Sequence, residues 1–130
     1  MKKTFLKAFL ALFLMLPVGL IAQTKIEIDI APNVLNIGSN GTVFTIHTDI
    51  KYSEVAGATC SLNGLVIEWW KSDDRGYFVA KFNIDAVKAL PDLKVGELNT
   101  LTLSGEKHSG ELFSGSQEVK VVKVVPKGKK

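Results

Sequence analysis

Apolar and polar residues alternate with a period of two through most of the chain after residue 22. Residues 25–30 (KIEIDI) and 42–50 (TVFTIHTDI) place isoleucine or phenylalanine at alternate positions, with charged or hydroxyl side chains between them. This alternation is typical of strands that bury one face and expose the other. On this pattern His47 is an exposed strand residue.

Turn residues divide the central part of the chain into further strands. Asn63-Gly64 stands between residues 58–62 and 65–71, and this dipeptide supplies the positive φ angles of a tight hairpin turn. A second turn, SDDRG at residues 72–76, leads into a strand over 77–82, which we expect to lie beside the preceding one.

A short helical turn follows before the chain returns to strand. Residues 83–90 (NIDAVKAL) offer Asn83 or Asp85 as the helix cap and Val87 and Leu90 for burial, and Pro91 ends the segment. Three more strands are then predicted, over residues 97–105, 112–115 and 117–125.

About seven short strands with frequent turns and one short helical turn predict an all-β fold. The size favours an antiparallel β-sandwich of the immunoglobulin-like kind, with a small closed β-barrel as the alternative.

The first 22 residues have the composition of a secretory signal peptide. A cationic start precedes an apolar stretch, and Pro17 and Gly19 interrupt it before Ala22. These two residues also disfavour an uncleaved membrane anchor, which needs about 20 continuous apolar residues. We expect cleavage after Ala22, leaving a sandwich domain over 23–125 and a basic, flexible tail over 126–130. The protein is then exported to the periplasm, cell surface or exterior, with no integral membrane segment after processing.

The formal charge of the chain, +3, comes from its two ends. Residues 23–130 keep all 13 acidic residues and 13 of the 16 basic ones, so their net charge is 0. Without the three lysines of the tail, residues 23–125 carry 10 basic and 13 acidic residues, a net charge of −3. This balance argues against nucleic acid as a partner.

No catalytic, cofactor or metal constellation is evident in the residues. The single cysteine, Cys60, lies in a predicted strand, where a buried apolar role is usual. His47 and His108 are not at metal-ligand spacing from another histidine or cysteine. Carboxylate pairs such as Asp73 and Asp74, or Glu106 with Glu111, could flank a glycosidic bond, but acidic residues accumulate in turns in any case. We therefore predict a protein that is not an enzyme.

The two adjacent tryptophans exceed what a plain sandwich needs. Strict alternation along residues 65–71 puts Trp69 and Trp70 on opposite faces, so one ring lies outside the core. If Trp69 is in the core, Trp70 faces out opposite Tyr77, in a patch edged by Glu68 and Lys81. Such a patch suits an unknown protein partner or a surface polysaccharide, or it serves as cross-strand packing. A bulge in this strand would make Trp69 the outer ring instead.

The sequence also resembles an immunoglobulin-like module of secreted and surface bacterial proteins. The resemblance rests on IDIAPNVLNIGSNG, LNGLVIEWWKSDDRGYFVAKF, VGELNTLTLSG and SGELFSGSQEVKVV, and covers nearly all of residues 23–125. It implies a sandwich used as a spacer or binding unit. Some members carry a calcium-type loop in the centre, but KSDDRG lacks the alternating oxygen ligands, so we expect no calcium here and a turn with solvated carboxylates.

These observations predict a noncatalytic exported β-sandwich module with a structural, adhesive or protein-interaction role. The alternative is a carbohydrate-binding protein that uses the exposed aromatic patch on the central hairpin.

Overall fold

The fold consists of two open β-sheets packed face to face. A computed structural model describes residues 23–125; the predicted signal peptide and the predicted basic tail lie outside the described residues. The six-stranded sheet contains β1 (Gln23–Lys25), β3 (Val34–Asn36), β5 (Val55–Leu62), β6 (Leu65–Val66), β9 (Leu98–Lys107) and β10 (Leu112–Val122). The four-stranded sheet contains β2 (Ile28–Ala31), β4 (Val43–Lys51), β7 (Trp69–Ser72) and β8 (Tyr77–Asn83).

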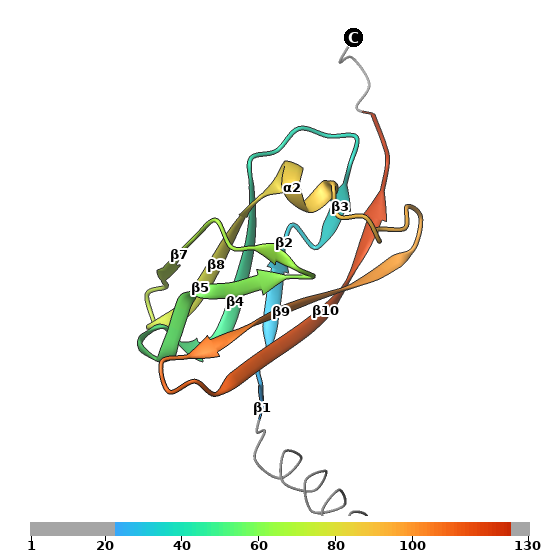
Figure 1. Ribbon diagram of the computed structural model, residues 1–130. Helices are drawn as coiled ribbons and strands as arrows, with labels where there is room; N and C mark the ends of the chain where they lie inside the picture. The colour runs from blue at the N-terminus through green and yellow to red at the C-terminus, as the bar shows by residue number, and fades with distance from the viewer. Residues whose placement is uncertain (1–22, 126–130) are drawn as a thin grey trace, which may run out of the picture.

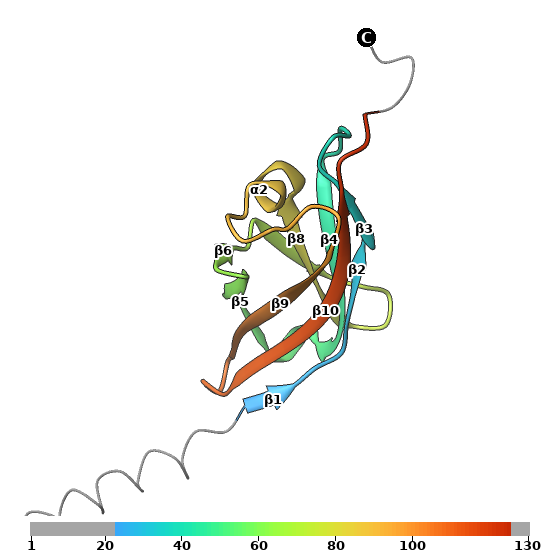
Figure 2. The ribbon, with the colours of Figure 1, turned by 90° about the vertical axis from the view of Figure 1, so that its right-hand side faces the viewer.

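The predicted all-β sandwich is confirmed. The strands follow the order β1-β10-β9-β5-β6 in one sheet, with β3 also on β10, and β2-β4-β8-β7 in the other (Figures 1 and 2). Both sheets are open, so the alternative of a closed barrel is wrong. Seven of the described strands have four or more residues, as the periodicity indicated. Two of the short ones, β1 and β3, pair with β10 in parallel, while the other pairings are antiparallel.

The core lies between the sheets and is filled by the inward positions of both. The inward side of β4 is buried and its outward side, including His47, is exposed, as the alternation predicted. Cys60 is buried as predicted. The largest fully buried side chains are Phe44, Phe78, Phe82, Phe113, Ile30, Leu35, Ile46, Leu62, Leu101 and Leu103.

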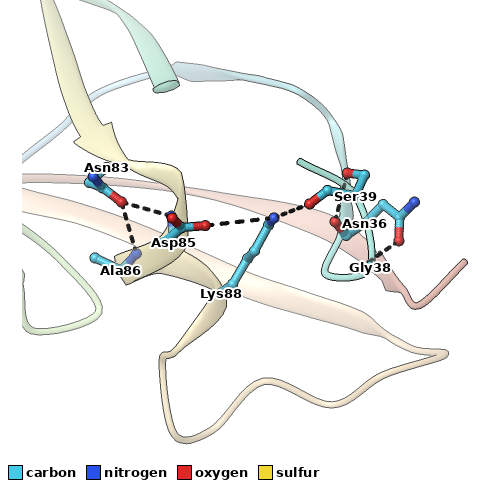
Figure 3. Close-up of polar contacts among 7 residues, drawn as sticks. All are labelled: Asn36, Gly38, Ser39, Asn83, Asp85, Ala86 and Lys88. Atoms are coloured by element: carbon cyan, nitrogen blue, oxygen red, sulfur yellow. Dashed lines mark hydrogen bonds and ion pairs between the residues drawn. The ribbon is translucent and has the colours of Figure 1, made fainter. Parts of the chain in front are cut away.

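The helix α2 (Ile84–Lys88) starts where the sequence predicted. The Asn83 side chain accepts hydrogen bonds from the backbone N–H of Asp85 (2.9 Å) and of Ala86 (3.3 Å), so Asn83 is the cap. Figure 3 shows this cap together with Lys88, whose Nζ donates to the backbone oxygen of Ser39. The helix is thereby tied to the loop before β4 at one end of the sandwich.

Two departures from regular pairing shape the four-stranded sheet and its surroundings. Five residues of β4, from His47 to Lys51, lie opposite only three residues of β8, from Val79 to Tyr77. The buried Thr48 hydroxyl lies within this bulge and donates to the backbone oxygen of Phe78 (2.6 Å). The bulged strand thus keeps its buried hydroxyl satisfied. The single-turn 3-10 helix η1 (Tyr52–Glu54) then leads the chain into β5 of the other sheet.

The C-terminal hairpin is longer than expected. The segments predicted as separate strands over 112–115 and 117–125 form one continuous strand, β10, which pairs along its length with β9. Gly115 is buried at the join and the register runs through it without a break. No helix in the described part of the chain is long and apolar enough to cross a membrane.

Candidate binding surface

The chain changes sheets in the middle of the segment that was predicted as one strand over 65–71. Ile67 N–H donates to the backbone oxygen of Cys60 in β5 (3.1 Å), whereas Glu68 N–H donates to that of Lys81 in β8 (3.1 Å). Two consecutive residues are therefore bonded to different sheets. The Asn63-Gly64 turn is confirmed, with φ angles of 47° and 88°. The prediction of one continuous strand after this turn is wrong, because β6 and β7 belong to separate sheets.

This crossing decides between the two orientations that the sequence allowed for the tryptophans. Directly paired residues project from the same face of a sheet. Trp70 pairs with Ala80, which belongs to the core, so Trp70 projects from the inner face. Trp69 pairs with Lys81 and projects from the outer face. The Trp69 side chain is 46% exposed and that of Trp70 is 36% exposed, so it is Trp69 that stands outside the sandwich.

Trp70 closes the gap between the edges of the two sheets. Its indole lies against the backbone of Gly57 in β5, where an added Cβ would stand 2.2 Å from Cε2 and 2.4 Å from Nε1. Gly57 lies in a bulge of β5, where the six residues from Ala56 to Ser61 lie opposite only three residues of β9. The glycine and the bulge together admit the ring. Trp70 therefore takes part in the packing between the sheets while 36% of it stays exposed, and the alternative in which Trp69 is the outer ring is the one that the strand pairing supports.

Trp69 lies among polar and cationic neighbours. The Lys81 Nζ atom is 5.5 Å from the centroid of the Trp69 ring and donates a hydrogen bond to Thr45 Oγ1 (2.9 Å). Lys71 is two residues from Trp69 on the same face of β7 and pairs with Val79. These five residues, Thr45, Trp69, Lys71, Val79 and Lys81, are called the Trp69 face below.

Val79 shows that the Trp69 face is ordered although it lies outside the core. Its side chain projects from the outer face between Tyr77 and Lys81, yet it is only 1% exposed and is absent from the core cluster. Its cross-strand partners on the two sides are His47 and Lys71. The surrounding outer-face side chains therefore cover Val79 and lose rotamer freedom in doing so.

The other predicted site residues are only partly brought together. Tyr77 is half-buried and pairs with Lys51 rather than lying opposite Trp70. It shares the face of Lys81 but is four residues away along β8, roughly 13 Å. The Arg75 guanidinium lies 5.6 Å from the centre of the Tyr77 ring. Glu68 is exposed at the crossing. Of the predicted set, Lys81 alone contacts the outward tryptophan.

The lysines of the Trp69 face have no carboxylate partner among the described residues. The ion pairs within 4.0 Å in residues 23–125 join Lys88 to Asp85, and Lys107 to Glu54 and Glu111. Burial lowers the pKa of Lys81 below its ordinary value, and the nearby Lys71 ammonium lowers it further. The two positive charges thus repel one another across the face.

The turn over 72–76 is held by one of its own carboxylates. Asp73 Oδ1 accepts hydrogen bonds from the backbone N–H of Arg75 (2.8 Å) and of Tyr77 (2.9 Å). The bond from Tyr77 is the main reason that the pKa of Asp73 is lowered. The expectation that this carboxylate is simply solvated is therefore wrong, because it organises the turn. No group of three or more His, Cys, Asp or Glu side chains in the described residues could hold a metal ion.

The residues weighed for catalysis have structural positions. Burial raises the pKa of the Cys60 thiol to about 11, which keeps it protonated at neutral pH. Glu111 pairs with Lys107 (3.1 Å) and accepts a hydrogen bond from Thr24 Oγ1 (2.8 Å). These contacts lower the pKa of Glu111, so it is a poor proton donor.

A cleft of about 570 Å³ lies elsewhere, between the segment after α2 and the start of β9. Its lining includes Asn63 and Asn99, whose side chains are already bonded to the backbone. Asn63 Oδ1 accepts from Thr102 N–H (2.7 Å), and Asn99 Oδ1 accepts from Lys94 N–H (2.8 Å). The best-placed polar groups of this cleft thus hold loops together.

Comparison with protein families, with curated proteins and with solved structures finds no match to this chain. The fold and the surface define a β-sandwich that carries one outward tryptophan on an ordered polar face. The resemblance to secreted immunoglobulin-like modules remains a prediction from the sequence.

Proposed function

We propose that the protein is a noncatalytic, exported adhesive module that binds polysaccharide through the Trp69 face. The observation that carries the proposal is the position of Trp69, 46% exposed on the outer face of a strand that is fixed at both ends. The export part of the proposal rests on the signal-like composition of residues 1–22.

The Trp69 ring is not part of the packing between the sheets. It is 46% exposed on the outer face, whereas Trp70 lies against the backbone of Gly57 and provides the indole that seals the sheet edge. An exposed tryptophan on a rigid strand presents a large flat apolar surface, and little conformational entropy is lost when a ligand stacks on it. The ring is thus suited to contact something outside the domain.

The neighbours of the ring favour a sugar over a protein as the ligand. An energetically dominant residue in a protein interface usually lies in a well-packed pocket from which water is excluded. Trp69 instead has the Lys81 ammonium beside its ring and Lys71 two residues along the same face, and Thr45, one strand further, holds the Lys81 ammonium. A sugar ring needs this combination, since its C–H face stacks while its hydroxyl groups form hydrogen bonds.

The noncatalytic part of the proposal is supported by the residues weighed for chemistry. The Cys60 thiol is buried, with a pKa of about 11, and Glu111 is held in its ionised form by Lys107 and Thr24. Neither provides an activated nucleophile or a general acid.

A protein partner is the second candidate, and one observation favours it. β7 is an edge strand of its sheet, and Val66 (69% exposed) lies with both tryptophans along this side of the domain. A strand of another protein could add to such an edge through main-chain hydrogen bonds.

The proposal is tested with tryptophan fluorescence of the processed chain, residues 23–130, titrated with a panel of soluble neutral and acidic polysaccharides. Three forms are compared: the wild type, Trp69→Ala, and Trp70→Phe, in which Trp69 is the only fluorescent indole. We expect a saturable change in the wild type and in Trp70→Phe, and none in Trp69→Ala. Circular dichroism confirms that each variant is folded.

Two results would contradict the proposal. A response that survives in Trp69→Ala places binding at another surface. The absence of a response to every polysaccharide, in a folded wild type, removes the polysaccharide proposal and leaves the β7 edge as the surface to study.

A further inference from the structure

Resting on the proposed function, we infer that the ligand of the Trp69 face is an acidic polysaccharide, one whose sugar units carry carboxylates. The inference starts from charge. Residues 23–125 carry 13 acidic and 10 basic residues, yet none of the described carboxylates lies within 4.0 Å of the Lys71 or Lys81 nitrogen. Two ammonium groups thus lie on the Trp69 face without an ion-pair partner among the described residues.

The acidic residues of the same sheet gather at a different place on its outer surface. A hollow near β2 and the end of β4 is lined by Glu27, Asp29, Asp49 and Asp73, together with His47 and Arg75. Glu27, Asp29 and Asp49 thus lie on the β2 side of the four-stranded sheet, whereas Lys71 and Lys81 lie on β7 and β8. Asp73 is the exception, because it closes the turn between β7 and β8. A carboxylate on a ligand would be repelled at the hollow and attracted by the two lysines.

Lys81 is positioned before any ligand arrives. Its ammonium group is held by Thr45 Oγ1 at 2.9 Å and lies 5.5 Å from the Trp69 ring centroid. Since the side chain is already ordered and partly desolvated, a carboxylate that reached it would gain a charge-assisted hydrogen bond at a small cost in side-chain entropy. It would also relieve the repulsion from Lys71, which now disfavours the charged form of Lys81.

The spacing of the groups suits a polymer. Trp69 and Lys81 are a directly opposed cross-strand pair, with Cβ atoms roughly 5 Å apart. Lys71 is two residues from Trp69 on the same strand, roughly 7 Å away. One sugar ring stacked on Trp69 can thus direct its carboxylate to Lys81, while the next unit along the chain reaches Lys71. A neutral polysaccharide would offer the two ammonium groups hydroxyl groups but no carboxylate to pair with.

The test compares two forms of one polymer, polygalacturonate and its fully methyl-esterified form, which has the same backbone without the charge. The processed chain is titrated with each, as wild type and as Lys71→Gln, Lys81→Gln and the double variant. Lys120→Gln is the matched control, because Lys120 is an exposed lysine on β10 of the other sheet. Poly-glutamate serves as an acidic polymer without sugar rings.

We expect the wild type to bind polygalacturonate and to bind the methyl ester at least tenfold more weakly. Each lysine variant should lose about tenfold in affinity for polygalacturonate, the scale of one charge-assisted hydrogen bond. Lys120→Gln should bind as the wild type does, and added salt should weaken wild-type binding more than that of the double variant.

The outcomes separate this inference from the proposed function. In one outcome the protein binds both polymers equally, and this binding is lost in Trp69→Ala but unchanged in the double lysine variant. That outcome overturns the inference of an acidic ligand and keeps the proposal of polysaccharide binding. Binding of poly-glutamate as tight as that of polygalacturonate shows that the face recognises negative charge without sugar rings. This result overturns the assignment of a polysaccharide as the ligand. Binding of polygalacturonate that persists in Trp69→Ala, or no binding of any polysaccharide in the panel, overturns both.

Discussion

Replacing Gly57 with alanine should displace Trp70 and destabilise the domain. The added Cβ would lie 2.2 Å from Cε2, 2.4 Å from Nε1 and 2.5 Å from Cδ2 of the indole, far inside the contact distance of carbon atoms. Because the nearest atoms belong to the rigid ring rather than to the end of a flexible chain, the ring as a whole has to move.

The magnitude follows from the burial of Trp70. The side chain is 36% exposed, so about two thirds of a surface of roughly 250 Å² is buried. At about 25 cal/mol per Å², complete release of the ring would cost about 4 kcal/mol, which is an upper limit. Partial displacement, like other overpacking, costs about 1–3 kcal/mol. The φ angle of Gly57 is outside the left-handed region, so alanine fits the backbone there. Alanine then offsets part of the loss by about 0.4–1 kcal/mol, because it reduces the conformational entropy of the unfolded chain.

We therefore expect Gly57→Ala to lower the free energy of unfolding by about 1–2 kcal/mol, with a fall in Tm of about 4–8 °C for each kcal/mol. Urea and thermal unfolding followed by circular dichroism measure this loss. The control is a double-mutant cycle with Trp70→Leu, whose side chain lacks the three clashing atoms. In that background Gly57→Ala should cost nothing or be stabilising. An equal loss in both backgrounds would refute the contact as the cause.

Three further predictions concern single residues. Asn83→Ala should lower stability by about 1 kcal/mol and Asn83→Asp by less, because only the second keeps an oxygen for the helix cap; equal losses in thermal unfolding would contradict this. Cys60 should resist a thiol reagent at pH 8 in the folded protein and react once urea unfolds it, whereas rapid native reaction would show an open site. The pKa of Asp73 is lowered in the fold, so its contribution is present above the unfolded pKa and is lost as the pH falls through the folded one. Asp73→Asn keeps the acceptor oxygen and should lose less stability than the wild type as the pH falls below the ordinary Asp pKa of about 4. An equal loss in both forms would rule the carboxylate out.

Much of the fold is local in origin and could be predicted from the sequence. The exposed His47 and the buried side of β4 follow from alternation alone, because both ends of that strand stay in one sheet. The Asn63-Gly64 turn and the Asn83 cap are set by the residues themselves. Each of these predictions needed only neighbours in the chain.

The candidate site could be predicted only in part. Lys81 and a tryptophan do meet on the outer face, but the tryptophan is Trp69 and not Trp70. The deciding contact is between Trp70 and Gly57, which are 13 positions apart and belong to different sheets. Alternation carries no information about such a contact, so it could not choose between the two rings.

The sandwich itself explains where alternation stops being reliable. The chain crosses between sheets at Ile26-Glu27 and again at Ile67-Glu68, and each crossing buries the isoleucine and exposes the glutamate. At the first crossing the inward positions continue in step, from Ile26 to Ile28 and Ile30. At the second crossing the inward positions shift by one residue. Strict alternation after Ile67 would turn Trp69 inward, but the next inward residue is Trp70. The shift leaves two successive residues outside the core, and the second of them is Trp69. The exposed ring thus follows from the way the strand changes sheets at that edge, and the bulge and glycine of β5 make room for the neighbouring ring that the shift turns inward.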